Sequence, residues 1–535
     1  MNTTASFLSY DQTGYFSKIV SDYVKQAPQI QPFLSHPVSI EGVKASIEAR
    51  KNFATNRELL VSVLKKQYAD VMVSEAVGKN IELLLHRNTF TLCTAHQPNI
   101  FTGPLYFIYK ILHVAKLAAQ LKTIMPENNF VPVYYMGSED ADLDELGHFY
   151  INGEKHEWQT SQTGAVGRMK VDKALVKLLD GLSGQLLVHP FGAEITDLMK
   201  ACYREGVMIE QATLQVVNQL FADYGLVIIL PDNAELKASF IPVIERELME
   251  EFSHSLVAET IAAYPADYKA QASGRELNMF YLKDDKRQRI EIQQDVWTVL
   301  NLDIQFTRQE LIAELRQHPE RFSPNVILRP VFQEWILPNI AFIGGGGEIA
   351  YWLQLKKVFE SVNVPYPLMI LRNSFMFISN QTQALVDKLH FNQTELFQSE
   401  LDLINQLVKR DSLLQVSLDK EHLQLADFYE QLKTIAGKID VTLSKHAGAL
   451  QTKAQKKLGA LEKKMLRAEK KKFEAQQRQL AKIKLQLFPK NNLQERVENV
   501  MPYYAKWGKD FISMLYNHSN GLEQQFGILI EDTHS

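Results

Sequence analysis

Four segments of this sequence share one design: an apolar strand, a loop of polar residues or glycines, and a helix. The strands are expected at residues 89–94, 131–136, 226–230 and 339–343. The third is a continuous apolar run, as is typical of a strand buried on both faces. Strands that alternate with helices predict a doubly wound parallel sheet, in which ligands bind beyond the carboxyl ends of the strands. The four loops should therefore meet at one edge of the sheet.

The last loop contains four consecutive glycines, residues 344–347, and a helix is expected to begin at Glu348. A bare backbone can present N–H groups to a phosphate, a carboxylate or a developing oxyanion. Glu348 could bind an amine or a metal ion. Alternatively, the glycines only permit a tight crossing from strand to helix. Four in a row exceed the needs of one turn, which favours a ligand site.

The second loop carries five acidic side chains within residues 139–145. These carboxylates could hold Mg²⁺, orient a cationic amine or form a solvated helix start. In an extended chain Asp140, Asp142 and Asp144 would share a face, whereas in a helix Asp140 and Asp144 would pair. Composition alone leaves the three interpretations open.

Histidine and arginine side chains are further candidates at the same edge. His96 and Gln97 follow the first strand, and His96 could act as a general base or donate to a phosphate. A lone histidine is, however, more often structural. Arg329 and Arg372 flank the glycine segment and could make bidentate contacts to a carboxylate. Surface ion pairs are the alternative for both arginines.

The spacing of these features divides the chain into seven expected parts, because a chain of 535 residues exceeds what one core usually serves. Helical periodicity and charge mark the insertions between parts of the core. The parts are core residues 1–150, an inserted connecting domain at 151–220, a core strand and helix at 221–240, a second insertion at 241–325, the last core part at 326–384, a coiled-coil arm at 385–490 and a tail at 491–535 that packs on the core.

The arm is expected to be helical and basic, with twelve Lys or Arg against three Glu between residues 453 and 484. Apolar residues from Leu458 to Ala475 form a heptad seam, and the register then slips before Pro489 ends the helix. The expected partner is an antiparallel helix around residues 390–435. A basic coiled coil could contact RNA, but more often it pairs with another helix or an acidic surface.

Composition excludes several classes of protein. The net charge of −4 gives no global drive toward nucleic acid or an anionic membrane, and no apolar run is long enough to span a bilayer. There is no phosphate-binding P-loop motif, no G-x-G-x-x-G after the first strand, and no zinc motif, so no metal ligands are assigned. Only Cys93 and Cys202 occur, and no signal peptide is seen, which predicts a reducing, cytoplasmic location.

Several segments in this order resemble the bacillithiol biosynthesis cysteine-adding enzymes, the cysteine ligase family. They are TAHQPNIFTGPLYFIYK, VPVYYMGSEDADLDELGHF, NMFYLKDDKRQRIE, RPVFQEWILPNIAFIGGGGEIAYWLQLK, LRNS and LQERV, and the resemblance runs nearly end to end. It implies a Rossmann-like core, inserted connecting domains and a C-terminal coiled coil that makes a homodimer. It also implies the final step of bacillithiol biosynthesis, in which cysteine is joined to glucosaminyl malate.

The resemblance and the loop positions together assign site residues. Asp140, Asp142, His148 and Glu348 are the expected catalytic residues. The expected substrate-binding residues are Thr94, His96, Gln97, Asn99, Thr102, Gly103, Tyr106, Glu139, Arg329, Gln333, Gly344, Gly345, Gly346, Gly347, Tyr351, Arg372 and Ser374.

Two loops depart from the family pattern. The first commonly reads T-G-Q-Q-A-G, whereas Ala95, His96, Pro98 and Asn99 stand here, and the acidic loop commonly has a histidine in place of Ala141. His148 is therefore preferred to His96 as the catalytic histidine.

Amide formation needs an activated carboxyl group, and the sequence does not name the activating cofactor. ATP with Mg²⁺ would supply an acyl-adenylate or acyl-phosphate, and the distant likeness of the family to nucleotide-using Rossmann enzymes suggests an adenine nucleotide. An already activated donor would serve as well. Two alternatives stay open: an acyl or nucleotidyl transferase acting on another amine, and a non-catalytic protein that binds RNA or a partner through its basic arm.

Overall fold

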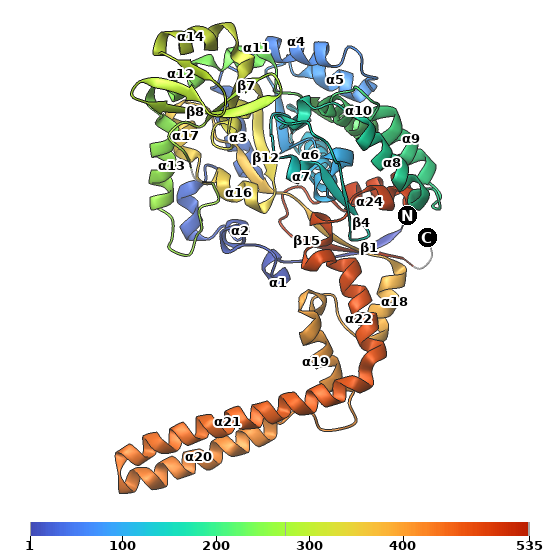
Figure 1. The fold of residues 1–535 in the computed structure, drawn as a ribbon, viewed down its shortest axis with the longest axis vertical. Helices are drawn as coiled ribbons and strands as arrows, with labels where there is room; N and C mark the ends of the chain where they lie inside the picture. Colours follow the sequence, from blue (N-terminus) through green and yellow to red (C-terminus); the bar gives the residue numbers. More distant parts are fainter. Residues whose placement is uncertain (1, 273, 533–535) are drawn as a thin grey trace. The chain divides into compact units, whose positions relative to one another are not determined.

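The computed structural model describes residues 2–272 and 274–532. It divides into two compact units (Figure 1). The first comprises Met1–Phe377 with Asn492–Ser535, and the second comprises Ile378–Asn491.

A five-stranded parallel sheet lies at the centre of the first unit, in the order β13-β12-β2-β3-β6. The chain therefore starts in the middle, proceeds outward through β3 and β6, and returns to add β12 and β13 on the other side. Right-handed crossovers in two opposite directions place helices on both faces of the sheet. This confirms the predicted doubly wound, Rossmann-like fold. Its strands are β2 (Thr89–His96), β3 (Asn129–Met136), β6 (Val227–Ile229), β12 (Asn339–Gly344) and β13 (Leu368–Leu371).

The strand order reverses between β2 and β12, and this reversal is the topological switch point of the sheet. Strands β2 and β12 are hydrogen-bonded neighbours, with Phe342 opposite Cys93. Doubly wound sheets bind ligands beyond the carboxyl ends of the strands at this point. The sheet topology therefore places the loop after β2, which begins with Gln97, beside the glycine loop that follows β12.

Helices cover the sheet because their apolar faces need burial. Helix α6 (Tyr106–Ile124) packs on β2 and β3, and α3 (Ile40–Lys51) packs on β12 and β13. Leu105 is the N-cap of α6 and Tyr106 its first residue, directly after Pro104. At the end of β12, a Cβ on Gly344 would lie 2.8 Å from the Phe342 ring, so only glycine fits there.

The first insertion is mainly helical, as its periodicity indicated. Its elements are β5 (Glu154–Glu157), α8 (Lys173–Leu186), α9 (Gly192–Cys202) and α10 (Ile209–Phe221). The short helix α7 (Leu143–Leu146) and the strand β4 (His148–Ile151), which pairs with β5, come just before it.

The second insertion differs from its helical expectation, because it also contains a five-stranded antiparallel sheet in the order β10-β9-β8-β7-β11. Gln294 and Asp295 both have positive φ in the two-residue turn between β8 and β9. That turn type normally carries glycine or asparagine, so the hairpin had no clear sequence signal. Helix α11 (Ala234–Ser239) precedes this insertion, in the core part expected at 221–240. The elements of the insertion are α12 (Ile241–Glu250), α13 (Phe252–Ala262), β7 (Met279–Lys283), β8 (Lys286–Gln293), β9 (Val296–Val299), β10 (Ile304–Phe306), α14 (Arg308–Gln317) and β11 (Phe322–Pro324).

The two ends of the chain join in a third sheet, of order β1-β15-β14, in which β1 and β15 are antiparallel. The tail therefore belongs to the first unit. The remaining elements of this unit are β1 (Thr3–Leu8), α1 (Tyr10–Thr13), α2 (Lys18–Val24), α4 (Arg57–Gln67), α5 (Glu75–Leu83), α15 (Arg329–Ile336), α16 (Gly346–Trp352), α17 (Lys356–Ser361), β14 (Ser374–Ile378), α23 (Met501–Trp507), α24 (Lys509–His518) and β15 (Phe526–Glu531).

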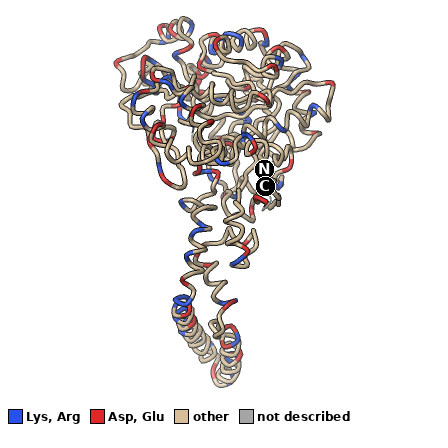
Figure 2. The backbone as a smooth tube through the Cα atoms, turned by 90° about the vertical axis from the view of Figure 1, so that its right-hand side faces the viewer, with Lys and Arg blue, Asp and Glu red and all other residues tan. Residues whose placement is uncertain are grey.

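The second unit is a helical arm. Helices α20 (Asp419–Ile439) and α21 (Val441–Lys470) form an antiparallel hairpin about Asp440, whose carboxylate accepts a 2.7 Å hydrogen bond from the Thr442 N–H (Figure 1). Charged residues of both signs occur along this hairpin (Figure 2). The other helices are α18 (Asn380–Lys388), α19 (Glu400–Asp411) and α22 (Glu474–Leu487).

Two details of the arm refine the sequence prediction. The antiparallel partner of α21 begins only at Asp419, because a separate helix and a non-helical segment occupy residues 390–418. A 3₁₀ turn, Lys471–Phe473, separates α21 from α22 and interrupts the predicted heptad seam before the register slip that was expected after Ala475. In the ranges that the structure describes, none of the helices has the length and apolar character needed to cross a membrane.

Candidate active site

A cleft of about 940 Å³ opens at the carboxyl ends of β2, β3 and β12. Gln97 reaches it after β2, Asp140 after β3 and Glu348 after β12. These three residues are far apart in the sequence, and three of the four loops expected to converge line this one cleft. The fourth loop, which follows β6, contributes none of its described residues to the lining.

Eleven of the residues assigned from sequence line this cleft. Together they contribute backbone amides, two carboxylates, two guanidinium groups, an imidazole, an amide and two phenols. They are His96, Gln97, Tyr106, Asp140, Arg329, Gly345, Gly346, Gly347, Glu348, Tyr351 and Arg372.

The other ten assigned residues do not line the cleft, and several of them hold the sheet together. The Thr94 hydroxyl donates to the Ile343 carbonyl at 2.8 Å, joining β2 to β12. The Gln333 amide donates to Glu334 at 2.9 Å, and the Ser374 hydroxyl accepts from Arg372 at 3.0 Å. Gly344 ends β12, and Asn99, Thr102 and Gly103 form the buried turn before α6.

The acidic loop divides into a buried part and an exposed part. Glu139 is buried and bonds to Lys237 at 2.5 Å, away from the cleft. Asp142 is exposed and caps the short helix α7, accepting from the Glu145 N–H at 3.2 Å. The His148 ring bonds to the Asp144 carbonyl at 2.7 Å. The geometry does not favour the catalytic roles expected for Asp142 and His148, because neither side chain lines the cleft.

The sequence assignments missed most of the cations in the cleft. Lys110 comes from the apolar helix α6, where a charge inside a buried stretch was the available signal. Arg275, Arg287 and Arg289 come from the second insertion, and Arg496 comes from the LQERV segment. The lining holds seven Lys or Arg side chains against three carboxylates, those of Asp140, Glu145 and Glu348. Such a surface favours anionic ligands.

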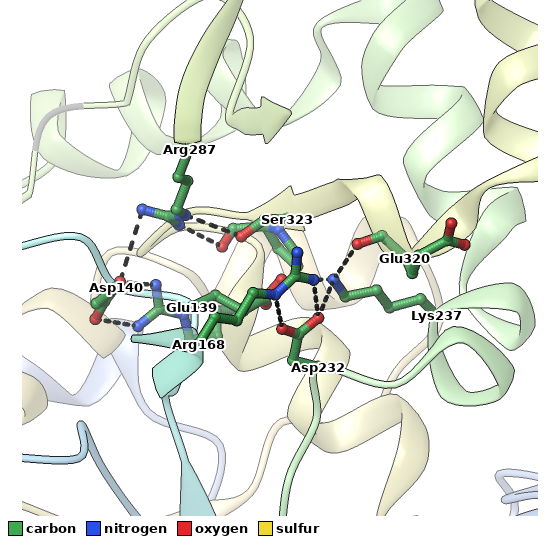
Figure 3. Close-up of polar contacts among 10 residues, drawn as sticks. Glu139, Asp140, Arg168, Asp232, Lys237, Arg287, Glu320 and Ser323 are labelled. Atoms are coloured by element: carbon green, nitrogen blue, oxygen red, sulfur yellow. Dashed lines mark hydrogen bonds and ion pairs between the residues drawn. The ribbon is translucent and has the colours of Figure 1, made fainter. Parts of the chain in front are cut away.

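Asp140 is held by arginine on two sides. Arg329 grips both carboxylate oxygens, at 2.8 Å for Nη1 to Oδ2, and Arg287 Nη1 lies 3.7 Å from Oδ1 (Figure 3). Burial alone would raise the pKa of Asp140, but the two arginines and Gln97 outweigh it and lower the pKa. Asp140 thus stays ionised with its oxygens occupied, so it is poorly placed to bind Mg²⁺ or a substrate amine.

Glu348 forms an ion pair with the buried Lys110 at the glycine turn. Its carboxylate also accepts from the Gly345 N–H at 2.7 Å, and Lys110 donates to the Ala95 carbonyl at 2.8 Å. Part of the expected backbone cradle is therefore occupied by the protein's own carboxylate. Burial lowers the pKa of Lys110, while Glu348 opposes that shift. The pair therefore links α6, and through the Ala95 carbonyl the end of β2, to the glycine turn after β12.

Arg372 is fixed by a second bidentate pair. Its Nη1 and Nη2 donate to Glu495 at 3.0 and 2.8 Å. Its Nε is buried without a hydrogen-bond partner among the described residues, and a Cβ on Gly345 would lie 3.6 Å from it. His96 Nε2 is likewise unpartnered. Burial, then Lys110 and Arg372, lowers the pKa of His96 well below its usual value, so this imidazole is neutral at neutral pH.

Both arginines first assigned to substrate carboxylates are thus already paired within the protein. For Arg275, Arg289 and Arg496, the described residues supply no salt bridge. Arg496 lies in contact distance of the Phe16 ring, at 5.6 Å from its centroid. These three side chains are the cations best able to receive an anionic substrate.

A second ion network includes Glu139 of the acidic loop (Figure 3). Arg168 donates to both oxygens of Asp232 at 2.6 and 2.8 Å, and Lys237 bridges Asp232 and Glu139. This network joins the first insertion to the helix that follows β6. It explains the burial of Glu139 without any ligand.

Glu210 borders this network and predicts a pH dependence of stability. Burial raises its pKa to about 7, and Asp232 adds to the effect. A carboxyl whose pKa is higher in the folded than in the unfolded protein stabilises the fold below its unfolded pKa, and this contribution is lost as the pH rises to about 7. Glu210→Gln should therefore gain roughly 1–3 kcal/mol in free energy of unfolding relative to wild type between about pH 5 and about pH 8.

Urea unfolding at the two pH values measures this difference. The exposed Glu205 serves as the matched control, because Glu205→Gln changes the same chemistry on the surface. A Glu210→Gln advantage that is equal at both pH values would contradict the assignment.

The cleft fits the phosphates of a nucleotide better than it fits a resident metal ion. Its arginines suit phosphate oxygens. Among residues 2–272 and 274–532, no three His, Cys, Asp or Glu side chains come together as a metal site.

Fold and cleft together define a Rossmann-like α/β protein whose charged ligand site lies at the topological switch point of its sheet. The family described as "Bacillithiol biosynthesis BshC, N-terminal Rossmann-like domain" matches residues 3–373, and the C-terminal coiled-coil domain of the same family matches residues 375–531.

Full-length relatives agree with this match. A protein of Flavobacterium johnsoniae is 38% identical over 524 residues, covering 98% of this chain and 99% of the relative. One of Cytophaga hutchinsonii is 40% identical over 489 residues, covering 91% and 92%. Both carry the name "Putative cysteine ligase BshC". This chain belongs to the bacillithiol biosynthesis BshC family and is an enzyme of the ligase class.

Proposed function

We propose that this enzyme joins the carboxyl group of cysteine to the amine of glucosaminyl malate, the final step of bacillithiol biosynthesis. Membership of the BshC family supports the pathway. The observation that carries the proposal is the cleft itself, whose lining holds the Glu348–Lys110 pair together with arginines that have no salt bridge among the described residues. Glucosaminyl malate offers both an amine and two carboxylates to such a surface.

Arg275, Arg289 and Arg496 are the proposed ligands of the malate carboxylates. Planar guanidinium groups match carboxylates in bidentate geometry, and these three line the cleft without a salt bridge to any described residue. Arg329 and Arg372 have a different role in this scheme, because each positions a carboxylate of the protein. Gln97 and Tyr106 line the same cleft and can bind the uncharged parts of the substrates.

Amide formation requires the substrate amine to lose protons as its nitrogen attacks the activated carbonyl carbon. Glu145 lines the cleft, and burial, with help from Asp142 and Asp140, raises its pKa. A raised pKa brings a carboxylate closer to the operating pH of a general base. We assign proton acceptance to Glu145 and amine binding to Glu348. Asp140 acts in this scheme by holding Arg329 and Arg287 in place.

Activation of the cysteine carboxyl group is assigned to an adenine nucleotide. ATP would supply a phosphate or adenylate leaving group, and the arginine-rich lining would bind its phosphates. The side chains of the cleft orient the two substrates and exclude water, which can supply much of the rate. The alternative is a nucleotide-dependent acyl or nucleotidyl transfer to another amine in the same cleft.

Reconstitution tests the proposal directly. Purified protein, cysteine and glucosaminyl malate are incubated with and without ATP and Mg²⁺, and the products are identified by mass spectrometry. Thiol analysis of a deletion strain that expresses the chain provides the test in cells. Absence of bacillithiol in both, with folded protein present, would refute the proposal.

Arg496→Gln should raise the KM for glucosaminyl malate about 10- to 100-fold and change kcat little, because a hydrogen bond to a charged group contributes roughly 1.5–3 kcal/mol. Steady-state kinetics measure both constants. Arg204 is exposed and is not among the lining residues, so Arg204→Gln is the control. An unchanged KM in Arg496→Gln would remove this side chain from malate binding.

We also propose that the arm makes a homodimer. Leu423, Phe428 and Ile435 on α20 are exposed in the single chain, although they lie on a helix that already has a partner. Large apolar side chains gathered on one hairpin favour burial against a second copy. Sedimentation of the full-length chain would reveal this state. Cys93 and Cys202 are buried free thiols, which fits action in the reducing cytoplasm.

A further inference from the structure

A strained turn supports one wall of the cleft. Phe101, Thr102 and Gly103 have φ of 50°, 73° and 61°, and only the last is a glycine. Left-handed backbone is unfavourable for the other two, so neighbouring groups must hold them there. The turn connects β2, which ends at His96, with α6, which begins at Tyr106. Both of those residues line the cleft.

Asn499 of the C-terminal tail fastens this turn. Its side-chain N–H groups donate to the Phe101 carbonyl at 2.8 Å and to the Gly103 carbonyl at 2.7 Å. Its Oδ1 accepts from the Met501 N–H at 2.8 Å. The side chain is fully buried, and the backbone N–H of Asn499 donates to the Tyr150 carbonyl at 3.0 Å. One amide thus spans both ends of the strained turn.

The residues just before Asn499 hold other parts of the same cleft. The Glu498 carbonyl accepts from the Leu105 N–H at 2.8 Å, at the start of α6. Glu495 fixes Arg372, and Arg496 lines the cleft between these two anchors. The segment Gln494–Asn499 therefore contacts the first loop and the strand after the glycine loop together.

We propose that Asn499 is a positioning residue, which holds the Phe101–Gly103 turn so that His96, Gln97, Tyr106 and Lys110 face the substrates. The expected effect of Asn499 on catalysis rests on the proposed function, whereas its effect on the geometry of the Phe101–Gly103 turn does not. In this scheme the C-terminal segment Gln494–Asn499 completes a site whose other loops come from the N-terminal part of the chain.

Asn499→Asp keeps the size of the side chain and the bond to Met501 but removes both donated bonds. Asn492→Asp is the matched control in the same tail, because Asn492 only accepts there, from the Leu493 N–H at 2.9 Å. Asn499→Ser is a second, uncharged variant in case a buried carboxylate prevents folding. Circular dichroism and thermal unfolding establish that each variant is folded.

Hydrogen exchange of peptides that cover residues 97–110 reports the geometry without reference to any reaction. We expect exchange there to rise about tenfold in the Asn499 variants, with kcat for bacillithiol formation reduced about tenfold and KM changed less. Asn492→Asp should match wild type in both measurements. Adding Thr102→Gly to an Asn499 variant should restore at least about threefold in kcat, because glycine adopts positive φ without strain.

Wild-type exchange in folded Asn499 variants would overturn the inference. Loss of activity that Thr102→Gly does not restore would also overturn it, since the defect would then lie outside the turn. A wild-type enzyme that forms no bacillithiol would refute the proposed function alone, because the exchange comparison still decides whether Asn499 holds the turn.

Discussion

Replacing Glu348 with alanine is expected to reduce bacillithiol formation by at least about 100-fold while the protein stays folded. Glu348 carries the carboxylate that faces the cleft from the glycine turn, and it is bonded to Lys110 and to the Gly345 N–H. Its loss removes the proposed amine ligand and leaves one more uncompensated cation in the cleft. The structural cost is about 3–5 kcal/mol, because the buried Lys110 loses its counter-charge.

Glu348→Gln separates the two contributions of this side chain. Glutamine can still accept from the Gly345 N–H, but it lacks the charge that pairs with Lys110 and with a substrate amine. We expect most of the activity loss in Glu348→Gln as well. The exposed Glu360 of the next helix provides the control substitution, Glu360→Ala. Wild-type turnover in either Glu348 variant would remove this residue from the mechanism.

The convergence of the loops was predictable because a doubly wound sheet leaves little freedom. Strands at residues 89–94 and 339–343 read as apolar runs, and the structure extends them only to Thr89–His96 and Asn339–Gly344. Parallel neighbours end at the same edge, so Gln97 and Glu348 had to meet once the fold was known. Side-chain periodicity and strand order together were sufficient for this step.

The partners of individual charges were not predictable in the same way. Arg372 pairs with Glu495, more than a hundred residues away, and Arg329 pairs with Asp140 across the cleft. A sequence shows which side chains lie near the edge, but not which of them neutralise each other. The unpaired cations therefore emerged only from the structure, and Arg289 came from an antiparallel sheet whose turns gave no glycine signal.

The same limit explains Gln333, which the family resemblance brought into the site. Gln333 and Asn339 both donate to Glu334, at 2.9 and 2.7 Å, and Glu334 is fully buried. Arg50 of α3 donates to the Glu334 carboxylate at 2.7 Å and to its carbonyl at 2.8 Å. These contacts fix α3 and α15 against the start of β12, at the opposite end from the cleft.

Arg50→Met should accordingly destabilise the protein by about 3–5 kcal/mol, because it leaves a buried carboxylate without its counter-charge. Burial raises the pKa of Glu334 and Arg50 opposes that rise, so the pKa climbs further once Arg50 is lost. A protonated Glu334 costs less to bury, so the deficit should be smaller at about pH 5 than at about pH 8. Urea unfolding at both pH values tests the magnitude and the sign.

Arg50→Met/Glu334→Gln is the decisive companion variant, because it removes both charges and keeps the amide partners of position 334. It should recover a large part of the lost stability, as replacement of a whole buried pair often does, and its own free energy of unfolding should lack the pH-dependent contribution of Glu334. The exposed pair of Lys51 and Glu48 is the control, since surface ion pairs contribute about 0–1 kcal/mol. A loss below about 1 kcal/mol in Arg50→Met would mean that packing of α3, and not this ion pair, fixes the helix on the sheet.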